Sequence, residues 1–235
     1  MLFYIGLHQP SDAKHFDKCM ISINRLVNRK SNFIVKEWIL DSGAFTQINK
    51  LGEFKQTEKE YTEQINRWAS VGNLVAAVSQ DYMCEPFVLD KTGLTVKEHQ
   101  EKTIERYIKI KEKTDVYIMP VLQGYTVEEY LSHLEMYGPL LKLGSWVGVG
   151  SICKRNSKPK EILPILQSIK DGRPDLKLHG FGVKTTALKN KDTYNLLYSA
   201  DSMAWSFNAR KYGKQNDWRE AKKFEEKILS IGKEG

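Results

Sequence analysis

Short apolar segments alternate with amphipathic ones along most of the chain. Eight apolar segments, rich in β-branched and aromatic residues, predict buried strands at 2–7, 19–26, 38–41, 74–80, 116–123, 146–152, 176–183 and 200–206. Five segments with apolar side chains at helical spacing predict helices at 57–70, 95–113, 126–137, 160–170 and 218–231. Thr126 followed by Glu129 fits a capping box at the start of one of these helices.

This alternation predicts the fold class. Near-continuous apolar strands that alternate with helices indicate a parallel sheet covered on both faces. We expect one α/β domain over residues 1–235, a (β/α)8 TIM-type barrel without a zinc subdomain. The alternative is an open doubly wound sheet, but no GxGxxG motif follows the first predicted strand.

The composition excludes several classes of protein. With 28% charged and 41% hydrophobic residues, the chain is neither disordered nor collagen-like. No apolar run approaches the roughly 18 residues of a membrane span, so we expect no membrane partner. The apolar start at residues 1–6 lacks a basic region and fits a first strand better than a signal peptide, so we expect a cytoplasmic protein.

The cysteines and histidines argue against a metal site. The three cysteines lie far apart and form no CxxC motif, and the five histidines form no HExxH motif. We therefore expect a reducing compartment, no metal and no cofactor. The net charge of +7 is compatible with a nucleic-acid partner, although many basic enzymes bind none.

Polar residues gather where the predicted strands end, and these carboxyl ends form the mouth of a barrel. The set consists of Asn24, Asp41-Ser42-Gly43, Gln80-Asp81, Gln123-Gly124, Gly148-Val149-Gly150-Ser151, Gly180-Phe181-Gly182 and Asp201. Asp41, Asp81 and Asp201 are thus expected at one mouth. Each alone could be a helix N-cap, but three on separate strand ends indicate a site.

Converging carboxylates suit chemistry at an anomeric carbon. In a closed pocket they push their pKa values apart, so that one stays ionised while another holds a proton. One carboxylate can then attack C1′ while a second handles the proton of the leaving group. Glycines near the mouth would let a flat ligand approach the backbone, although packing in a tight barrel explains them equally well.

Several of these segments together resemble the tRNA-guanine transglycosylase superfamily. Asp41-Ser42-Gly43-Ala44-Phe45 is similar to the family's DSGGF motif, and Asp81, Cys84 and Pro86 resemble its D-x-C-x-P segment with one extra residue. Gln123-Gly124, Val147-Gly148-Val149-Gly150 and His179-Gly180-Phe181-Gly182-Val183 resemble the family's QG, GGL-type and MGVG segments, and Asp201 stands where its last-strand nucleophile falls. The resemblance covers residues 38–210 in the family's order.

Two departures from the family pattern matter. The usual cysteine-rich zinc subdomain is absent, and only Asp201 remains of two aspartates on the last strand. The compact zinc-free form looks most like the DNA-directed branch, which occurs in phages and bacterial genomic islands and places 7-deazaguanine derivatives into DNA. Because the missing subdomain supports dimerisation in the tRNA enzymes, we expect a monomer.

The resemblance implies a role for each matched residue. Asp201 would be the nucleophile at C1′, Asp41 would shuttle the proton, and Asp81 would accept hydrogen bonds from the N1–H and amino group of guanine. The remaining base contacts would come from Gln123 and the backbone of Val149 and Gly150 at O6, from Phe45 and His179 beside the ring, and from the motif residues Ser42, Gly43, Gly124 and Gly182. A core position explains Phe45 equally well and His179 somewhat better.

DNA and a free 7-deazaguanine base are the partners that this resemblance implies. Basic residues after strand ends are candidates for holding the DNA backbone: Arg25, Lys154, Arg155, Lys184, Arg210 and Lys211. The other interpretation of these residues is a solvated basic rim. Three functions stay open as alternatives: a tRNA-guanine transglycosylase, a nucleoside or base glycosidase on the same barrel, and an inactive base-binding subunit.

Overall fold

The computed structural model describes residues 1–155 and 158–232, and within these ranges nine strands form one parallel sheet. They are β1 (Leu2–Leu7), β2 (Lys18–Ser22), β3 (Glu37–Asp41), β4 (Asn73–Val78), β5 (Ile118–Met119), β6 (Val121–Leu122), β7 (Trp146–Val149), β8 (Lys177–Gly180) and β9 (Ser199–Ser202). Their order in the sheet is β5-β4-β3-β2-β1-β9-β8-β7-β6. The expected α/β fold with a parallel sheet is confirmed.

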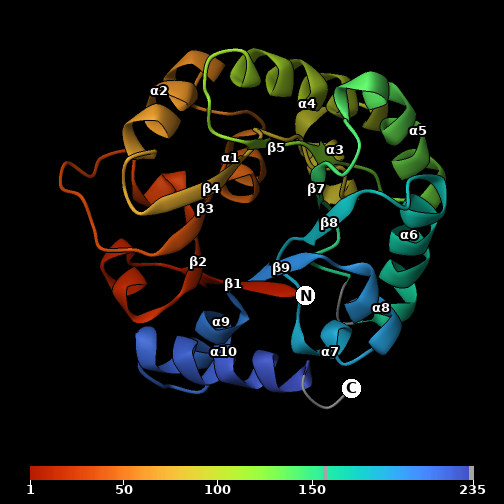
Figure 1. The fold of residues 1–235 in the computed structure, drawn as a ribbon. Helices are drawn as coiled ribbons and strands as arrows, with labels where there is room; N and C mark the ends of the chain where they lie inside the picture. The colour runs from red at the N-terminus through yellow and green to blue at the C-terminus, as the bar shows by residue number, and fades with distance from the viewer. Residues whose placement is uncertain (156–157, 233–235) are drawn as a thin grey trace.

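The two outermost strands of this order nearly close the sheet into a barrel. Only Pro120 separates β5 from β6 in the chain. On one side the Ser79 N–H donates to the Met119 carbonyl at 3.0 Å, and on the other the Gly148 N–H donates to the Pro120 carbonyl at 2.8 Å. The short segment 118–122 therefore contacts both β4 and β7, and Figure 1 shows the resulting ring of strands inside a ring of helices.

Each of the five predicted helices is present. The α-helices are α1 (Ala44–Leu51), α2 (Glu58–Trp68), α3 (Pro86–Thr92), α4 (Val96–Lys111), α5 (Val127–Tyr137), α6 (Pro159–Gly172), α7 (Thr185–Leu188), α8 (Lys191–Leu196), α9 (Ala204–Lys211) and α10 (Trp218–Ile231). Capping boxes start α2, α4 and α5, including the one expected at Thr126. Across the described ranges, no helix has the length and apolar character needed to cross a bilayer.

Several predicted strands run past the ends of the observed ones, and two of them do so by four residues. The segment 19–26 stays extended only to Ser22, and the segment 200–206 only to Ser202. The Ser22 Oγ accepts a hydrogen bond from the Asn24 N–H at 3.4 Å, and the Ser202 Oγ accepts one from the Ala204 N–H at 3.2 Å. These local bonds turn the chain out of the sheet into a 3-10 helix (Ile23–Arg25) and into α9.

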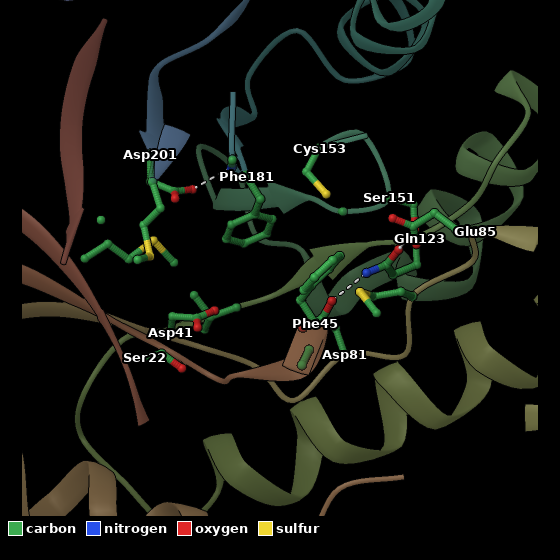
Figure 2. A pocket seen from close by; sticks show the side chains of 18 residues that line it. Ser22, Asp41, Phe45, Asp81, Glu85, Gln123, Ser151, Cys153, Phe181 and Asp201 are labelled. Carbon is green, nitrogen blue, oxygen red and sulfur yellow. Dashed lines mark hydrogen bonds between the residues drawn. The ribbon is translucent and has the colours of Figure 1, made fainter. Parts of the chain in front are cut away.

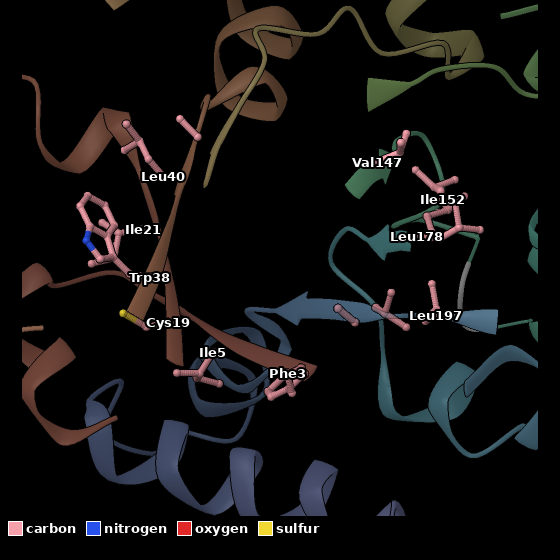
Figure 3. Close-up of a cluster of buried hydrophobic side chains, with 14 of the residues drawn as sticks. Phe3, Ile5, Cys19, Ile21, Trp38, Leu40, Val147, Ile152, Leu178 and Leu197 are labelled. Atoms are coloured by element: carbon pink, nitrogen blue, oxygen red, sulfur yellow. The ribbon is translucent and has the colours of Figure 1, made fainter. Parts of the chain in front are cut away.

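Side chains alternate between the inside and the outside of the barrel. Phe3, Ile5 and Leu40 belong to the large core between strands and helices, part of which Figure 3 shows, whereas Tyr4 and Ile39 belong to the smaller cluster inside the ring. The same alternation fixes the strand ends. A residue that follows an outward-facing one points inward, as Asp41 does after Leu40. At the carboxyl ends of the strands, several of these inward-facing residues are polar.

Core packing on the outer face of the strands dominates stability, which a matched leucine pair can test. Leu178 on β8 is fully buried, whereas Leu143 is 89% exposed. We expect Leu178→Ala to lower the free energy of unfolding by about 2–5 kcal/mol because it leaves a cavity. The same change at Leu143 should stay within about 0.5 kcal/mol. Urea denaturation measures both, and equal losses would contradict the packing described.

Candidate active site

A cavity of about 300 Å³ opens at the carboxyl ends of the strands, where the predicted site residues lie. Asp41, Asp81 and Asp201 all line it, as the sequence predicted (Figure 2). The remaining polar wall includes Glu85, Gln123 and Ser151, and apolar or sulfur side chains that include Met20, Phe45, Phe181 and Met203 complete the lining. This volume is at the small end of ligand pockets and suits a single base.

Asp201 on β9 is held by contacts on one of its oxygens. The Gly182 N–H donates to Asp201 Oδ1 at 2.9 Å, and His179 Nε2 lies 3.4 Å from the same atom. His179 is fully buried, and its Nδ1 lies 2.9 Å from Ser199 Oγ, which accepts a hydrogen bond from Trp146 Nε1 at 2.7 Å. The carboxylate therefore has a fixed orientation, and its side chain keeps 13% exposure toward the cavity.

Asp41 is the last residue of β3, three residues before the start of α1. The Gly43 N–H donates to Asp41 Oδ2 at 3.1 Å, and Gly43 itself has a φ of +75°, which favours glycine. The pKa of Asp41 is raised to about 6, mainly by burial and also by the charge of Asp201, while hydrogen bonds from Ser22 and Gly43 oppose the shift. At neutral pH a fraction of the Asp41 carboxyl groups therefore keeps its proton, which suits an acid and base.

Asp81 follows β4 and is only 6% exposed. Its carboxyl group accepts hydrogen bonds from Ser42 Oγ at 3.3 Å and from the Gln123 side-chain amide. Burial raises the pKa of Asp81 to about 7; the Asp41 charge acts in the same direction, while the Gln123 and Ser42 hydrogen bonds oppose it. A ligand with N–H donors would stabilise the ionised form of this carboxyl group.

A chain of buried polar groups continues from Asp81 along the cavity wall. Gln123 Oε1 lies 2.7 Å from Ser151 Oγ, and the same hydroxyl lies 2.8 Å from Glu85 Oε2. The Cys84 N–H donates to this hydroxyl at 2.8 Å, which fixes its position. A Cβ on Gly150 would lie 2.2 Å from Gln123 Nε2, so glycine is needed there to make room for the amide.

Several expected base contacts do not reach the cavity through the atoms predicted. Gly150 lines the cavity, but its N–H donates to the Leu122 carbonyl and is therefore not free for O6, and Val149 does not line the cavity. Gly124 packs against the start of α5, where a Cβ would lie 2.9 Å from the Tyr130 nitrogen. His179 lies behind Phe181, at 4.8 Å between ring centroids, and contacts Asp201 instead of facing the cavity.

The aromatic residues at the cavity are Phe45 and Phe181. Phe45 is 44% exposed and lines the cavity, so a core position is the wrong interpretation of this side chain. The sequence analysis missed the side chain of Phe181, and it missed Glu85 as well. The pattern Gly180-Phe181-Gly182 at a strand end was the available signal for Phe181, whereas Glu85 lies four residues beyond Asp81 in a loop without periodicity.

The predicted basic residues occupy different environments near the mouth. Lys154 is exposed, with its Nζ 3.8 Å from the Phe87 ring centroid and 5.4 Å from that of Phe45. Arg25 and Arg210 are exposed. The pKa of His8, which directly follows β1, is lowered mainly by burial of the imidazole and also by the charges of these two arginines. The other three are exposed Lys211 on α9, half-buried Lys184 before α7, and half-buried Arg155.

The Arg155 guanidinium forms hydrogen bonds with other groups of the protein. Its guanidinium donates to the carbonyls of Ser151 at 3.3 Å and Tyr125 at 2.6 Å, and to the Tyr130 hydroxyl at 3.4 Å. These bonds tie the loop after β7 to the start of α5. Arg155 therefore holds the cavity wall in place, and its hydrogen bonds are directed inward instead of toward a nucleic acid.

Comparison with known protein families supplies one match. The family model described as "DpdA: DeoxyPurine in DNA protein A" matches residues 1–218 of the 235-residue chain. No curated protein matches the chain. Among the described residues, no group of three or more histidine, cysteine, aspartate or glutamate side chains is placed to hold a metal ion.

The raised pKa of Asp81 predicts a pH-dependent stability. In the unfolded chain Asp81 loses its proton near its ordinary value of 3.8, but in the folded protein only near 7. Between these values the folded state binds more protons, so the free energy of unfolding should fall as pH rises from about 4 to about 7. We expect Asp81→Asn to reduce the loss between pH 4 and pH 8 by roughly 2–4 kcal/mol.

Urea denaturation at pH 4 and pH 8 measures this difference. Asp90→Asn, at an exposed position on α3, controls for the change in net charge. A variant that lost as much stability between the two pH values as the unmodified protein would show that burial does not shift the Asp81 titration.

Proposed function

We propose that this chain, which belongs to the DpdA family of DNA 7-deazaguanine transglycosylases related to tRNA-guanine transglycosylase, exchanges guanine in DNA for a free 7-deazaguanine base. The observation that carries the proposal is the convergence of Asp41, Asp81 and Asp201 on one base-sized cavity. Two of these carboxyl groups have raised pKa values, so the cavity can hold an ionised carboxylate and a proton donor together.

In the first step Asp201 attacks C1′ of the target nucleotide. A bond forms between a carboxylate oxygen and C1′ while the bond from C1′ to N9 breaks, and the electron pair of that bond leaves with guanine. Asp41 donates its proton to the departing base. The fixed orientation of Asp201, held by the Gly182 N–H, supports the role of nucleophile because the attacking oxygen needs no reorganisation.

In the second step the 7-deazaguanine enters the emptied base position. Asp41, now ionised, takes the proton from N9 of the incoming base. N9 then attacks C1′, the bond between C1′ and Asp201 breaks, and the aspartate leaves as a carboxylate. A pKa of about 6 for Asp41 supports both directions of proton transfer near neutral pH.

Recognition of the base falls to the buried polar wall. Asp81 accepts hydrogen bonds from N1–H and the exocyclic amino group, and the Gln123 amide, which lies beside Asp81 and donates to it, donates to O6 of a bound base. Met20, Met203, Phe45 and Phe181 provide apolar contacts for a flat ring. A guanine stacked in a duplex cannot reach this cavity, so the target nucleotide must be flipped out or single-stranded.

We also propose that the barrel is of the eight-stranded TIM type, with residues 118–122 counted as one strand. Proline has no N–H for the ladder, so Pro120 interrupts the hydrogen-bond pattern within a segment that stays extended. The pairing of Val78 with Met119 and of Val121 with Gly148 supports this interpretation, because the two partners lie on opposite sides of one segment.

The nucleophile can be tested by base exchange. Labelled guanine or 7-deazaguanine is offered together with duplex DNA, single-stranded DNA or tRNA. We expect incorporation into DNA, and we expect Asp201→Asn to lower the rate by about a thousandfold or more, as removal of a catalytic side chain does. Denaturing mass spectrometry of the unmodified protein with DNA alone should show a covalent adduct that Asp201→Asn lacks.

Each other outcome of that experiment assigns a different function. Incorporation into tRNA alone would retain the chemistry and replace the substrate. Release of free guanine without incorporation would identify a glycosidase. Full activity of Asp201→Asn would rule out this residue as the nucleophile.

Binding of DNA at the mouth predicts a salt dependence that is sensitive to Lys154. Each phosphate contact lowers the slope of log K against log salt by about 0.9 for duplex DNA. We expect Lys154→Ala to reduce the magnitude of the slope by about that amount. Lys142→Ala, at an exposed position before β7 on the opposite end of the barrel, should leave the slope unchanged. Fluorescence anisotropy at several salt concentrations measures both, and equal slopes for all proteins would exclude Lys154 as a phosphate contact.

A further inference from the structure

The outer face of α9 combines an exposed aromatic ring with two positive charges. Phe207 is 63% exposed, and Arg210 and Lys211 are exposed as well. These three residues stand at positions i, i+3 and i+4 of the helix, so their side chains share one face. The opposite face, with Trp205 and Ala209, is buried against the protein. The fold therefore holds α9 by one face and leaves the ring of Phe207 open to a ligand.

The chain around this face is basic. Residues 202–216 contain no aspartate or glutamate but three basic residues, of which Lys214 pairs with Glu220 at 3.5 Å. Tyr212, which directly follows α9, is 65% exposed, and Lys211 Nζ lies 5.5 Å from the centroid of its ring. One exposed apolar side chain would be ordinary. Two aromatic rings beside exposed cations match the composition of surfaces that bind single-stranded nucleic acid.

The start of α9 lies at the rim of the cavity. The helix begins three residues after Asp201, and Met203 between them lines the cavity. Trp205 Nε1 donates to the Gly6 carbonyl at 2.8 Å, and Gly6 lines the same cavity. A DNA strand with its guanine in the cavity and C1′ at Asp201 therefore passes beside α9.

We propose that this face of α9 binds single-stranded DNA next to the target guanine, with Phe207 stacked on a neighbouring base and Arg210 and Lys211 at the adjacent phosphates. A base inside a duplex has both faces covered by its neighbours, whereas a base in a single strand can place one face on an aromatic ring. The substrate is thus a single-stranded stretch of DNA. This inference rests on the proposed function and deepens it, because the strand reaches α9 from the guanine in the cavity.

The affinities for a single strand and for its duplex test the stacking contact. The probe is a thymine oligonucleotide with one guanine, alone or annealed to its complement, and fluorescence anisotropy measures binding. We expect Phe207→Ala to weaken binding of the single strand by about tenfold, the size of one stack between a base and an aromatic ring. Binding of the duplex, which relies on phosphate contacts, should change by less than about twofold.

Tyr198→Ala is the matched control for this experiment. Tyr198 is 39% exposed, and Lys177 Nζ lies 5.1 Å from its ring centroid, but it precedes β9 at the opposite end of the barrel. Both affinities should therefore stay unchanged in Tyr198→Ala. An unchanged affinity of Phe207→Ala for the single strand, or an equal loss for both forms of DNA, would overturn the proposal.

Two other substitutions of Phe207 separate stacking from a general apolar contact. Phe207→Trp keeps a flat ring and should bind the single strand at least as tightly as the unmodified protein does. Phe207→Leu keeps an apolar side chain without a ring and should lose about tenfold in affinity, as the alanine variant does. Full affinity of Phe207→Leu would contradict stacking. Thermal unfolding identifies any variant that fails to fold, and the binding of Phe207→Trp shows that the position tolerates substitution.

Photochemical crosslinking tests the contact in the unmodified protein. 5-Iodouracil replaces the thymine on either side of the guanine, and irradiation joins it to an aromatic side chain that it contacts. We expect mass spectrometry of the digested adduct to identify Phe207, or Tyr212 beside this face. Adducts at other residues alone, or no adduct in a sample that binds the oligonucleotide, would overturn the proposal.

The outcomes separate this inference from the proposed function. If base exchange into DNA occurs but Phe207→Ala binds the single strand as tightly as the unmodified protein does, the role of α9 is wrong and the function stands. If the expected affinities and adducts are found but no base is incorporated into DNA, the surface on α9 stands and the proposed function fails. Failure of the folded unmodified protein to bind DNA would refute both.

Discussion

Pairing of the segment 118–122 with β4 on one side and with β7 on the other holds the barrel together. Without it the strands would form an open sheet, and the ends of β3 and β9 would not face each other across an enclosed space. Because the ring nearly closes, every inward position at the carboxyl ends lies on the same small cavity. The site therefore depends on the two-residue strands β5 and β6, which pair with β4 and β7 and are separated by Pro120.

Much of this arrangement could be predicted from the sequence, and the failures have physical causes. The buried strands and the long helices have strong periodicity, and the carboxylates at the ends of three predicted strands do meet in one cavity. The predicted ends of β2 and β9 were wrong because side-chain hydroxyls of Ser22 and Ser202 cap the following turns, which hydrophobic periodicity does not report. Glu85 was missed because its place in the cavity wall depends on a contact with Ser151, 66 residues away in the chain.

Glycine and histidine positions show a second limit of sequence reasoning. A motif can mark a site although its residues serve it indirectly. Gly150 makes room for the Gln123 amide, and His179 supports Asp201 from behind the cavity wall. Gly150 and His179 support the site, whereas burial of Asp41 and Asp81 destabilises the ionised forms of these two carboxyl groups. Both carboxyl groups nevertheless lie in the cavity wall, at positions where uncharged side chains would be less costly to bury.

The capping boxes at α2, α4 and α5 have a consequence for the electric field around the mouth. In a parallel barrel these helix N-termini lie on the same side as the carboxyl ends of the strands, and their macrodipoles would direct positive potential toward an approaching polyanion. Glu60, Glu98 and Glu129 each place a carboxylate at one of these N-termini and offset that potential. At these three N-termini the backbone therefore contributes little to the long-range attraction of phosphates, which must come there from lysine and arginine side chains.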